Sequence, residues 1–518
     1  MFYSLFRISE SIDNGYNITE DHTLITTKNA LEKRSFTSEF EQLVTTDMET
    51  TRRFRPLWVF YSVLTAEMFG MNLLLFNIFT ILICILTSFF LFKFASNIGF
   101  SDLQSILFAL ITLIGPATEM YIMRIDAEIL GMLMLSVSLY FLSKSIFSDK
   151  RNNLYKVLFI ISILFTATSK ESFLITIPAI LFLYLWIYGL KNKIGIFESF
   201  KKNIFTTVTV SIILLLFTFI LVRNVGIDQH AYAGVDSNSF SVSVIIGFLD
   251  TIISNNFFFI ILIGLFIFFE NELQNNKLRS DYIKQHSKNL FFIILFALLV
   301  LLPQLALYFK SGFLSGRYYL PYLIGYTFFV IYILKIIFDS KTISKYIKYL
   351  YLSSIIAFIV IELISVTIPS LVYHSRKCKA STQMIETIAK DNHKDLLVVL
   401  DPAQNYYEFY SLKLILEDLG VKLDYQYDFI YFENKGKLYS NKKLYDKVLQ
   451  ESTSLLGDKL IDSTKDNSRL NNILIFGGLD NKFIEKNGKW FNTNNYRKKK
   501  FVSTTKFEFG SWILYTKK

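Results

Sequence analysis

Residues 71–92 read MNLLLFNIFTILICILTSFFLF, an apolar run that contains no charged side chain. A helix rises about 1.5 Å per residue, so about 20 such residues cross the roughly 30 Å of hydrocarbon in a bilayer. The run therefore predicts a membrane-spanning helix, and similar runs follow it in regular succession. We place the spans near residues 71–92, 103–120, 126–143, 155–169, 172–190, 204–222, 255–269, 290–309, 319–338 and 350–372.

The composition of the whole chain also indicates a membrane protein. Of its 518 residues, 52% are hydrophobic and 19% are charged, whereas about 25% of the residues of a soluble protein are charged. The net charge of +11 does not indicate a nucleic-acid partner, because Lys and Arg lie mainly in short loops between apolar runs and in the tail. Cys84 and Cys378 lie in different environments and predict neither a disulfide nor a metal site.

The loops between the apolar runs alternate in charge. One set is rich in Lys and Arg, and the other contains only Arg124, Lys170, Arg223, Lys310 and Arg317. Loops rich in Lys and Arg stay in the cytoplasm. The second set is therefore predicted to face outward, together with residues 1–55 and 374–518.

The composition after Tyr373 is typical of a soluble domain. A strand-like run at 396–400, a helical pattern at 406–419 and a second strand-like run at 421–427 predict a β-α-β unit, and we expect a further strand at 473–476 and a hairpin within 501–515. The predicted fold class is mainly α, a polytopic helical membrane bundle of about ten spans with a C-terminal, outward-facing α/β domain. Its expected parts are an outward N-terminal loop (1–55), the bundle (56–373) and the α/β domain (374–518).

The N-terminal 55 residues are polar, and their outward position would need a preceding hydrophobic helix. Met1–Phe6 is too short to span a bilayer, so we expect the chain to lack a first helix of the bundle. The alternative is an N-terminal tail translocated without such a helix. The short apolar stretch Pro56–Gly70 is predicted to lie at the membrane interface.

Charged residues near membrane depth are costly, so those at the outward ends of the spans are candidate functional residues. Glu20 and Asp21 form an acidic pair in the N-terminal part. Such a pair binds a divalent cation, or one carboxylate acts as the base for an acceptor hydroxyl. The alternative interpretation is a solvated turn.

Four further places contain outward charges. Arg55 enters the short apolar stretch at headgroup level, where its guanidinium suits a phosphate or a lipid headgroup. Arg124 and Asp126 lie in a short turn with Glu119 and Glu128. These charges either form part of a functional site or hold two helices together through a local ion pair of Arg124 with Asp or Glu. The last two places are the turn of Lys170 and Glu171 and the pair Arg317 and Tyr318, where single cations also serve topology.

These motifs and their order resemble the GT-C superfamily of membrane glycosyltransferases, especially the branch of protein O-mannosyltransferases and aminoarabinose transferases. The likeness covers residues 20 to about 340. It consists of an acidic pair followed by Leu-Ile and Asn, an Arg-Pro-Leu entry, an Arg-x-Asp turn, a Ser-Lys-Glu turn and an Arg-Tyr-x-x-Pro helix start. The matching residues are Glu20, Asp21, Leu24, Ile25 and Asn29; Arg55, Pro56 and Leu57; Arg124 and Asp126; Ser169, Lys170 and Glu171; and Arg317, Tyr318 and Pro321.

The resemblance implies roles for these positions. Asp21 would be the catalytic acid or base beside Glu20, although Glu20 stands where the family has Asp, and Asp126 would assist or bind a metal. Lys170 and Arg317 would approach the phosphate of the lipid donor. The outward charges add Arg55 and Arg124 to the expected phosphate-binding set, and Tyr318 is included as the neighbour of Arg317.

We therefore expect an enzyme that moves a sugar from a polyprenyl-phosphate donor to a lipid, glycan or protein acceptor outside the cytoplasm, in the inner membrane of a bacterium. No cofactor is firmly implied, although the carboxylates leave a divalent metal possible. The main alternative is a non-catalytic scaffold or a protein that handles lipid-linked glycans, including a polymerase or ligase. A secondary transporter is disfavoured because repeated halves and broken spans are not evident in the sequence.

Overall fold

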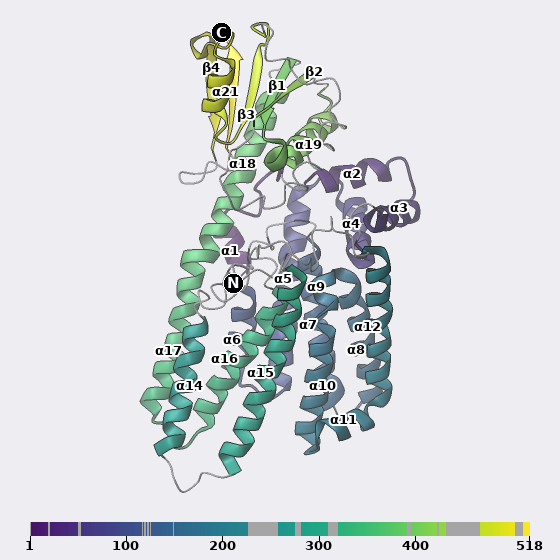
Figure 1. Ribbon diagram of the computed structural model, residues 1–518, viewed down its shortest axis with the longest axis vertical. Coiled ribbons are helices and arrows are strands. Elements are labelled where there is room, and N and C mark those ends of the chain that lie inside the picture. Colours follow the sequence, from purple (N-terminus) through teal and green to yellow (C-terminus); the bar gives the residue numbers. More distant parts are fainter. Residues whose placement is uncertain are drawn as a thin grey trace.

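A computed structural model of the chain describes residues 2–18, 21–49, 53–115, 118, 121, 124, 126–148, 150–225, 257–274, 281–308, 320–390, 395–421, 424–430, 467–502 and 511–518. Within these ranges a long bundle of helices has a five-stranded sheet domain at one end (Figure 1). The predicted fold class, a helical membrane bundle with a C-terminal α/β domain, is confirmed.

The N-terminal part, which we predicted as a loop, contains helices. They are α1 (Phe2–Ile8), α2 (Asp21–Leu31) and α3 (Phe36–Glu49), and the apolar stretch that follows forms α4 (Pro56–Phe69). Phe36 and Phe40 of α3 pack edge-on against Phe60 of α4. These helices are short and α2 and α3 are mostly polar, so they depend on contacts with the rest of the protein.

The bundle follows in the order that the apolar runs predict. Its helices are α5 (Leu73–Asn97), α6 (Asp102–Leu113), α7 (Ala127–Phe147), α8 (Asn152–Ser169), α9 (Glu171–Leu174), α10 (Ile177–Asn192), α11 (Ile196–Lys202), α12 (Ile204–Val225), α14 (Phe257–Gln274), α15 (Asp281–Tyr308), α16 (Leu320–Asp339), α17 (Lys345–Glu362), the π-helical turn η4 (Leu363–Thr367) and α18 (Ile368–Lys390). Each of the ten predicted spans overlaps one or more of these helices, but α6 ends at Leu113, well before the end of the span predicted at 103–120.

Seven helices of the described residues are long and apolar enough to cross a membrane, fewer than the ten that we expected. They are Leu73–Asn97, Ala127–Phe147, Glu171–Asn192, Ile204–Arg223, Lys288–Leu307, Leu320–Asp339 and Lys345–Lys390. Two further apolar helices, Asp102–Leu113 and Phe259–Glu270, are shorter. Helix α6 ends because Ile114 is extended, and the next residue, Gly115, has φ 89°, which suits glycine. The chain is a multi-pass integral membrane protein.

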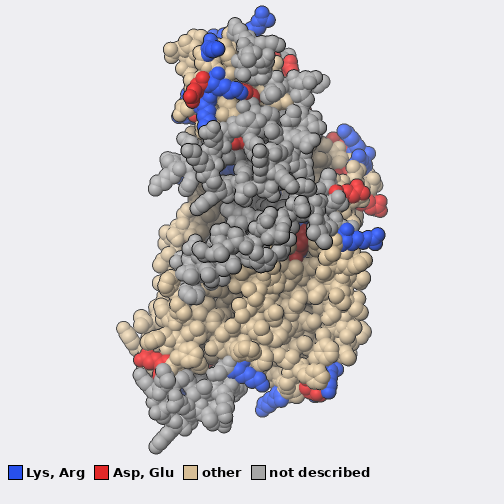
Figure 2. Space-filling view, in the orientation of Figure 1, with Lys and Arg blue, Asp and Glu red and all other residues tan. Residues whose placement is uncertain are grey.

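The outer surface of the bundle is apolar. Large hydrophobic side chains are exposed on it, including Phe205 (75%), Phe266 (67%) and Phe219 (62%). Figure 2 shows an uncharged belt over the described part of the bundle, with Lys and Arg at its lower end. A surface of this kind fits lipid chains.

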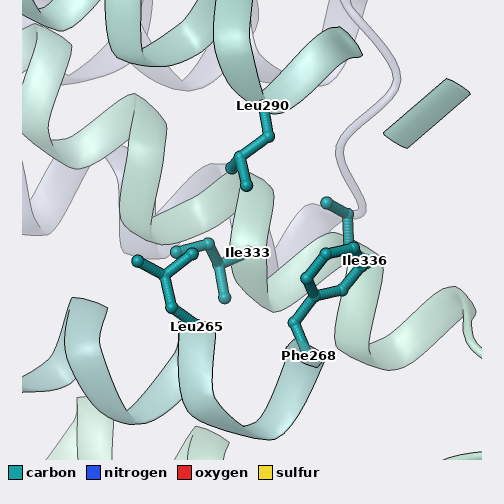
Figure 3. A pocket seen from close by; sticks show the side chains of 5 residues that line it. All are labelled: Leu265, Phe268, Leu290, Ile333 and Ile336. Carbon is teal, nitrogen blue, oxygen red and sulfur yellow. The ribbon is translucent and has the colours of Figure 1, made fainter. Parts of the chain in front are cut away.

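Side chains of three helices line a small apolar crevice that is too narrow to hold a water molecule (Figure 3). Its lining residues are Leu265 and Phe268 of α14, Leu290 of α15, and Ile333 and Ile336 of α16. This lining offers no acid, base or hydrogen-bonding side chain. The crevice is therefore not a candidate catalytic site.

The C-terminal domain is a mixed sheet in the order β2-β1-β3-β5-β4. Its elements are β1 (Asp395–Leu400), α19 (Pro402–Asp418), β2 (Asp424–Phe429), β3 (Asn472–Phe476), α21 (Asp480–Asn487), the 3₁₀ turn η6 (Thr493–Asn495), β4 (Tyr496–Phe501) and β5 (Trp512–Lys517). Strand β1 pairs in parallel with β2 and β3, and β5 pairs antiparallel with β3 and β4. The predicted β-α-β unit is confirmed.

The sheet is buried on both faces, which explains the unbroken apolar runs of β1 and β3. One face packs against α18 and α19 through Ile385, Val398 and Leu416, and the other packs against α21 through Leu397 and Phe483. The edge strand β4 instead exposes Lys498, Lys499 and Lys500. Lysines on an edge strand disfavour pairing with another chain.

The N-terminal part connects the bundle to the sheet domain. Thr382 of α18 accepts a hydrogen bond from the N–H of Tyr16 at 2.8 Å, and Lys28 of α2 pairs with Asp418 of α19 at 2.6 Å. Gly15, with φ 80°, lies so close to Thr382 that a Cβ at this position would overlap it. Residues close to Asp21 in sequence are thus held by the C-terminal domain.

Candidate active site

A buried ion pair between Asp21 and Arg124 lies at the end of the bundle that faces the sheet domain. Nη1 of Arg124 donates to both carboxylate oxygens of Asp21, at 3.0 and 2.9 Å, and both side chains are 4% exposed. The N–H of Asn17 donates to Oδ2 at 2.6 Å. Burial raises the pKa of Asp21, although the charge of Arg124 and these hydrogen bonds oppose the rise.

Arg124 also binds three polar groups from other parts of the chain. Its Nε donates to Asn77 of α5 at 3.1 Å, and its Nη2 donates to the Asn14 side chain at 2.8 Å and to the carbonyl of Gly15. One guanidinium therefore joins the N-terminal part, α2 and α5. We had considered a local pair of Arg124 with Asp126 or Glu128, but its carboxylate partner is Asp21.

Arg55 forms a second buried pair, with Asp47 at the end of α3. Its Nε and Nη2 donate to the two oxygens of Asp47 at 3.1 and 2.7 Å. The guanidinium also lies over the ring of Trp58, 4.1 Å from the centroid. Burial lowers the pKa of Arg55, but the carboxylates of Asp47, Glu171 and Glu128 oppose this and raise it.

Lys170 forms a third buried pair, with Glu128 of α7. Lys170 lies in extended conformation between α8 and α9, so the helix breaks there and its side chain turns inward. The break leaves Lys170 and Glu171 both buried. Close packing of α7 and α9 supports the turn, because the Phe173 ring lies where a side chain on Gly131 would be.

Asp126 is the N-cap of α7, and its Oδ1 accepts a hydrogen bond from the N–H of Glu128 at 3.5 Å. This position fits a helix start as well as the predicted catalytic role. In the part of the chain that the structure describes, no three His, Cys, Asp or Glu side chains gather as metal ligands would. Glu20, Arg317 and Tyr318 lie outside the described residues.

Several residues of this region were not foreseen as partners. Asp47, Asn14 and Asn77 bind the two arginines, and contacts between such distant positions have no signal in one sequence. Glu171 and Gln304 contain buried acceptor oxygens without a hydrogen-bond partner among the described residues. For Gln304, the signal was a polar residue next to Pro303 within an apolar run.

The contact of α2 with α19 contains a half-buried histidine and should depend on pH. Nδ1 of His22 lies 3.1 Å from the Ser411 hydroxyl, and burial lowers the pKa of His22 from 6.5 to about 4. The folded state therefore disfavours the protonated ring. We expect docking of α2 to weaken as the pH falls from about 6.5, by about 2 kcal/mol at pH 5, and to level off below about 4.

Hydrogen exchange of the α2 and α19 amides at pH 7 and pH 5 measures this effect. Protection should fall about 30-fold more in the wild type than in His22→Gln, which removes the titrating group. An equal fall in both proteins would show that His22 is not responsible.

Comparison with known proteins gives limited information. No protein-family model and no curated protein matches the chain. Among solved structures, it is similar to the crystal structure of the Archaeoglobus fulgidus oligosaccharyltransferase tethered with an acceptor peptide containing the NVT sequon via a disulfide bond. The TM-score is 0.36 and the identity 10%, over 84% of this chain and 62% of that one, so this chain spans less than two thirds of its length. At this identity the likeness says nothing of activity.

Proposed function

We propose that the protein is a membrane glycosyltransferase that moves a sugar from a polyprenyl-phosphate donor to a lipid, glycan or protein acceptor. The observation that supports this most directly is the layer of buried ion pairs Asp21–Arg124, Asp47–Arg55 and Glu128–Lys170. These pairs lie where the bundle meets the sheet domain. Buried charges in a membrane protein are costly and mark functional sites by default.

The cations of this layer suit a phosphate. Arginine binds two phosphate oxygens at once, and lysine provides a compact positive charge. A polyprenyl phosphate keeps its hydrocarbon tail in the bilayer and its phosphate near the headgroups, at the depth of helix ends. Arg124, Arg55 and Lys170 are therefore the proposed ligands of the donor phosphate, with Arg317 and Tyr318 as further candidates.

The Asp21–Arg124 pair suggests how a base becomes available. A phosphate that binds Arg124 competes with the Asp21 carboxylate for the same N–H groups. Asp21 would then accept the proton of the acceptor hydroxyl, whose oxygen attacks the anomeric carbon while the bond from that carbon to the phosphate oxygen breaks. The phosphate leaves with the bonding electrons, and the arginine stabilises its charge. Glu20 and Asp126 are the proposed assisting carboxylates.

The side of the membrane follows from the charge of the loops. The lysine-rich loops would face the cytoplasm, which puts the ion-pair layer and the sheet domain outside it. We propose the inner membrane of a bacterium as the location. Whether a divalent metal binds the carboxylates is part of the same test.

The deciding experiment measures sugar transfer in membranes supplied with a panel of polyprenyl-phosphate sugars, with and without a metal chelator. Asp21→Asn keeps the shape and removes the charge, and transfer should fall about 100-fold. The control Asp13→Asn changes an exposed carboxylate in the same segment and should transfer as the wild type does. Equal transfer by Asp21→Asn and the wild type would contradict the role of Asp21.

One observation favours a second candidate, a non-catalytic scaffold or lipid-linked glycan handling protein, including a polymerase or ligase. Asp21 and Arg124 hydrogen-bond each other as partners in a purely structural ion pair would. In that case no donor of the panel supports transfer by the wild type, and Asp21→Asn changes stability alone.

A further inference from the structure

Two buried acceptor oxygens belong to Glu171, the residue after Lys170 of the ion-pair layer, and to Gln304, which contacts the residue after Glu171. Glu171 is the first residue of α9 and is 9% exposed, and its Oε1 makes no hydrogen bond within the described chain. Gln304 of α15 is 1% exposed, and its Oε1 likewise has no partner there. A buried carboxylate oxygen or amide oxygen without a partner costs about 1–3 kcal/mol. Two such atoms, on residues linked through Ser172, point to a ligand.

Gln304 is fixed in this orientation. Its Nε2 donates to the carbonyl of Ser172, the residue next to Glu171. Because the amide nitrogen is engaged with this carbonyl, the amide oxygen points away from it. Gln304 therefore presents an acceptor beside the turn that contains Glu171.

The surroundings give Glu171 little compensation. Arg55 interacts with it electrostatically, but two nitrogens of that guanidinium bind Asp47. The neighbouring cation Lys170 is paired with Glu128. A group that satisfies Glu171 and Gln304 must therefore donate hydrogen bonds, and the hydroxyl groups of a sugar are such donors.

We infer that Glu171 and Gln304 form a subsite that binds the hydroxyl groups of the donor sugar. This inference rests on the proposed function, since it places the sugar beside the phosphate that Lys170 would bind. Lys170 and Glu171 are consecutive, so phosphate and sugar ring would be held by adjacent residues of one turn. A single metal ion is a poorer match, because one carboxylate and one amide supply few ligands.

Binding tests the subsite without requiring transfer. The probes are a short-chain prenyl-phosphate hexose, its monodeoxy analogues and the prenyl phosphate without sugar, and the readout is their affinity for the purified full-length protein. A hydrogen bond to a charged group contributes about 1.5–3 kcal/mol, so the wild type should bind the hexose about 10–100-fold more tightly than one of the deoxy analogues. Glu171→Gln and Gln304→Leu should each lose most of this preference and keep the affinity for prenyl phosphate.

A matched control and a stability measurement separate binding from folding. Glu198→Gln changes an exposed glutamate in the first turn of the short helix α11 and should leave the preference intact. Glu171→Gln removes an unsatisfied buried charge, so its unfolding temperature should equal or exceed that of the wild type.

The outcomes distinguish the subsite from the proposed function. If the wild type binds the hexose, its deoxy analogues and prenyl phosphate equally, or if Glu171→Gln keeps the full preference, the subsite is wrong even in an active enzyme. A preference that depends on Glu171, without sugar transfer from any donor, would establish the subsite and reject the glycosyltransferase.

Discussion

Arg124→Met is expected to lower the free energy of unfolding by about 3–5 kcal/mol. The reason is that removing one partner of a buried ion pair leaves the charge of the other partner uncompensated. Here the remaining group is the Asp21 carboxylate, 4% exposed. The substitution also removes the hydrogen bonds from Arg124 to Asn14 and Asn77. Denaturant titration of the protein in detergent micelles measures the loss.

Two comparisons make this result specific to the pair. The double variant Arg124→Met with Asp21→Asn also removes the uncompensated carboxylate charge, so it should recover part of the lost free energy of unfolding. Arg497→Met, at an exposed position of β4, should change stability by less than about 0.5 kcal/mol. If the double variant is no more stable than Arg124→Met alone, the ion pair is not the cause.

The loss in Arg124→Met should also depend on pH. Without the arginine, burial keeps the pKa of Asp21 raised, so the folded state binds a proton more readily than the unfolded chain does. Stability then decreases as the pH rises through that pKa. Arg124→Met should therefore be less destabilised at pH 5 than at pH 8.

Lys170→Met is the second substitution with a large expected effect, again a loss of about 3–5 kcal/mol in the free energy of unfolding. It leaves Glu128, 3% exposed, without its ammonium partner, next to the buried carboxylate of Glu171. Arg55 interacts with both carboxylates, but it is already paired with Asp47, so it compensates them only in part. The same denaturant titration measures this loss.

Lys413→Met provides the matched control, since it removes an ammonium from an exposed pair. Lys413 lies 3.7 Å from Glu417, and the two side chains are 33% and 52% exposed. Such pairs contribute about 0.2–1 kcal/mol. Equal losses from Lys170→Met and Lys413→Met would mean that burial does not strengthen the pair, whereas recovery on adding Glu128→Gln would identify the stranded carboxylate as the cause.

Much of the fold follows from the sequence because its signals are local. An apolar run such as Leu73–Asn97 has few alternatives to a membrane helix, since its backbone must form its own hydrogen bonds in lipid. The apolar runs at β1 and β3 predict strands equally clearly, because they are short and bounded by polar segments. Helices α2 and α3 were missed because their sequences are mostly polar.

The sequence predicts which charged residues belong to the candidate site, but it does not predict which of them form ion pairs with each other. Asp21, Arg55, Arg124 and Lys170 stand out as charges at the ends of apolar runs. Which carboxylate meets which cation depends on how distant segments pack, and Asp21 and Arg124 are far apart in sequence. Glu171 and Gln304 could be recognised only once their surroundings were known, since an unsatisfied acceptor is a property of the packed structure.

One continuous helix joins the bundle to the sheet domain. It runs from Lys345 to Lys390 through the π turn η4, a length of about 70 Å at about 1.5 Å per residue. A π turn is a local change in the hydrogen-bond ladder and a common place for a helix to bend. A bend of about 10° there would displace the far end of α18, about 37 Å away, by about 6 Å. The helix beyond η4 thus has the geometry of a lever arm, because a bend of about 10° within one turn displaces its far end by about the width of a sugar ring.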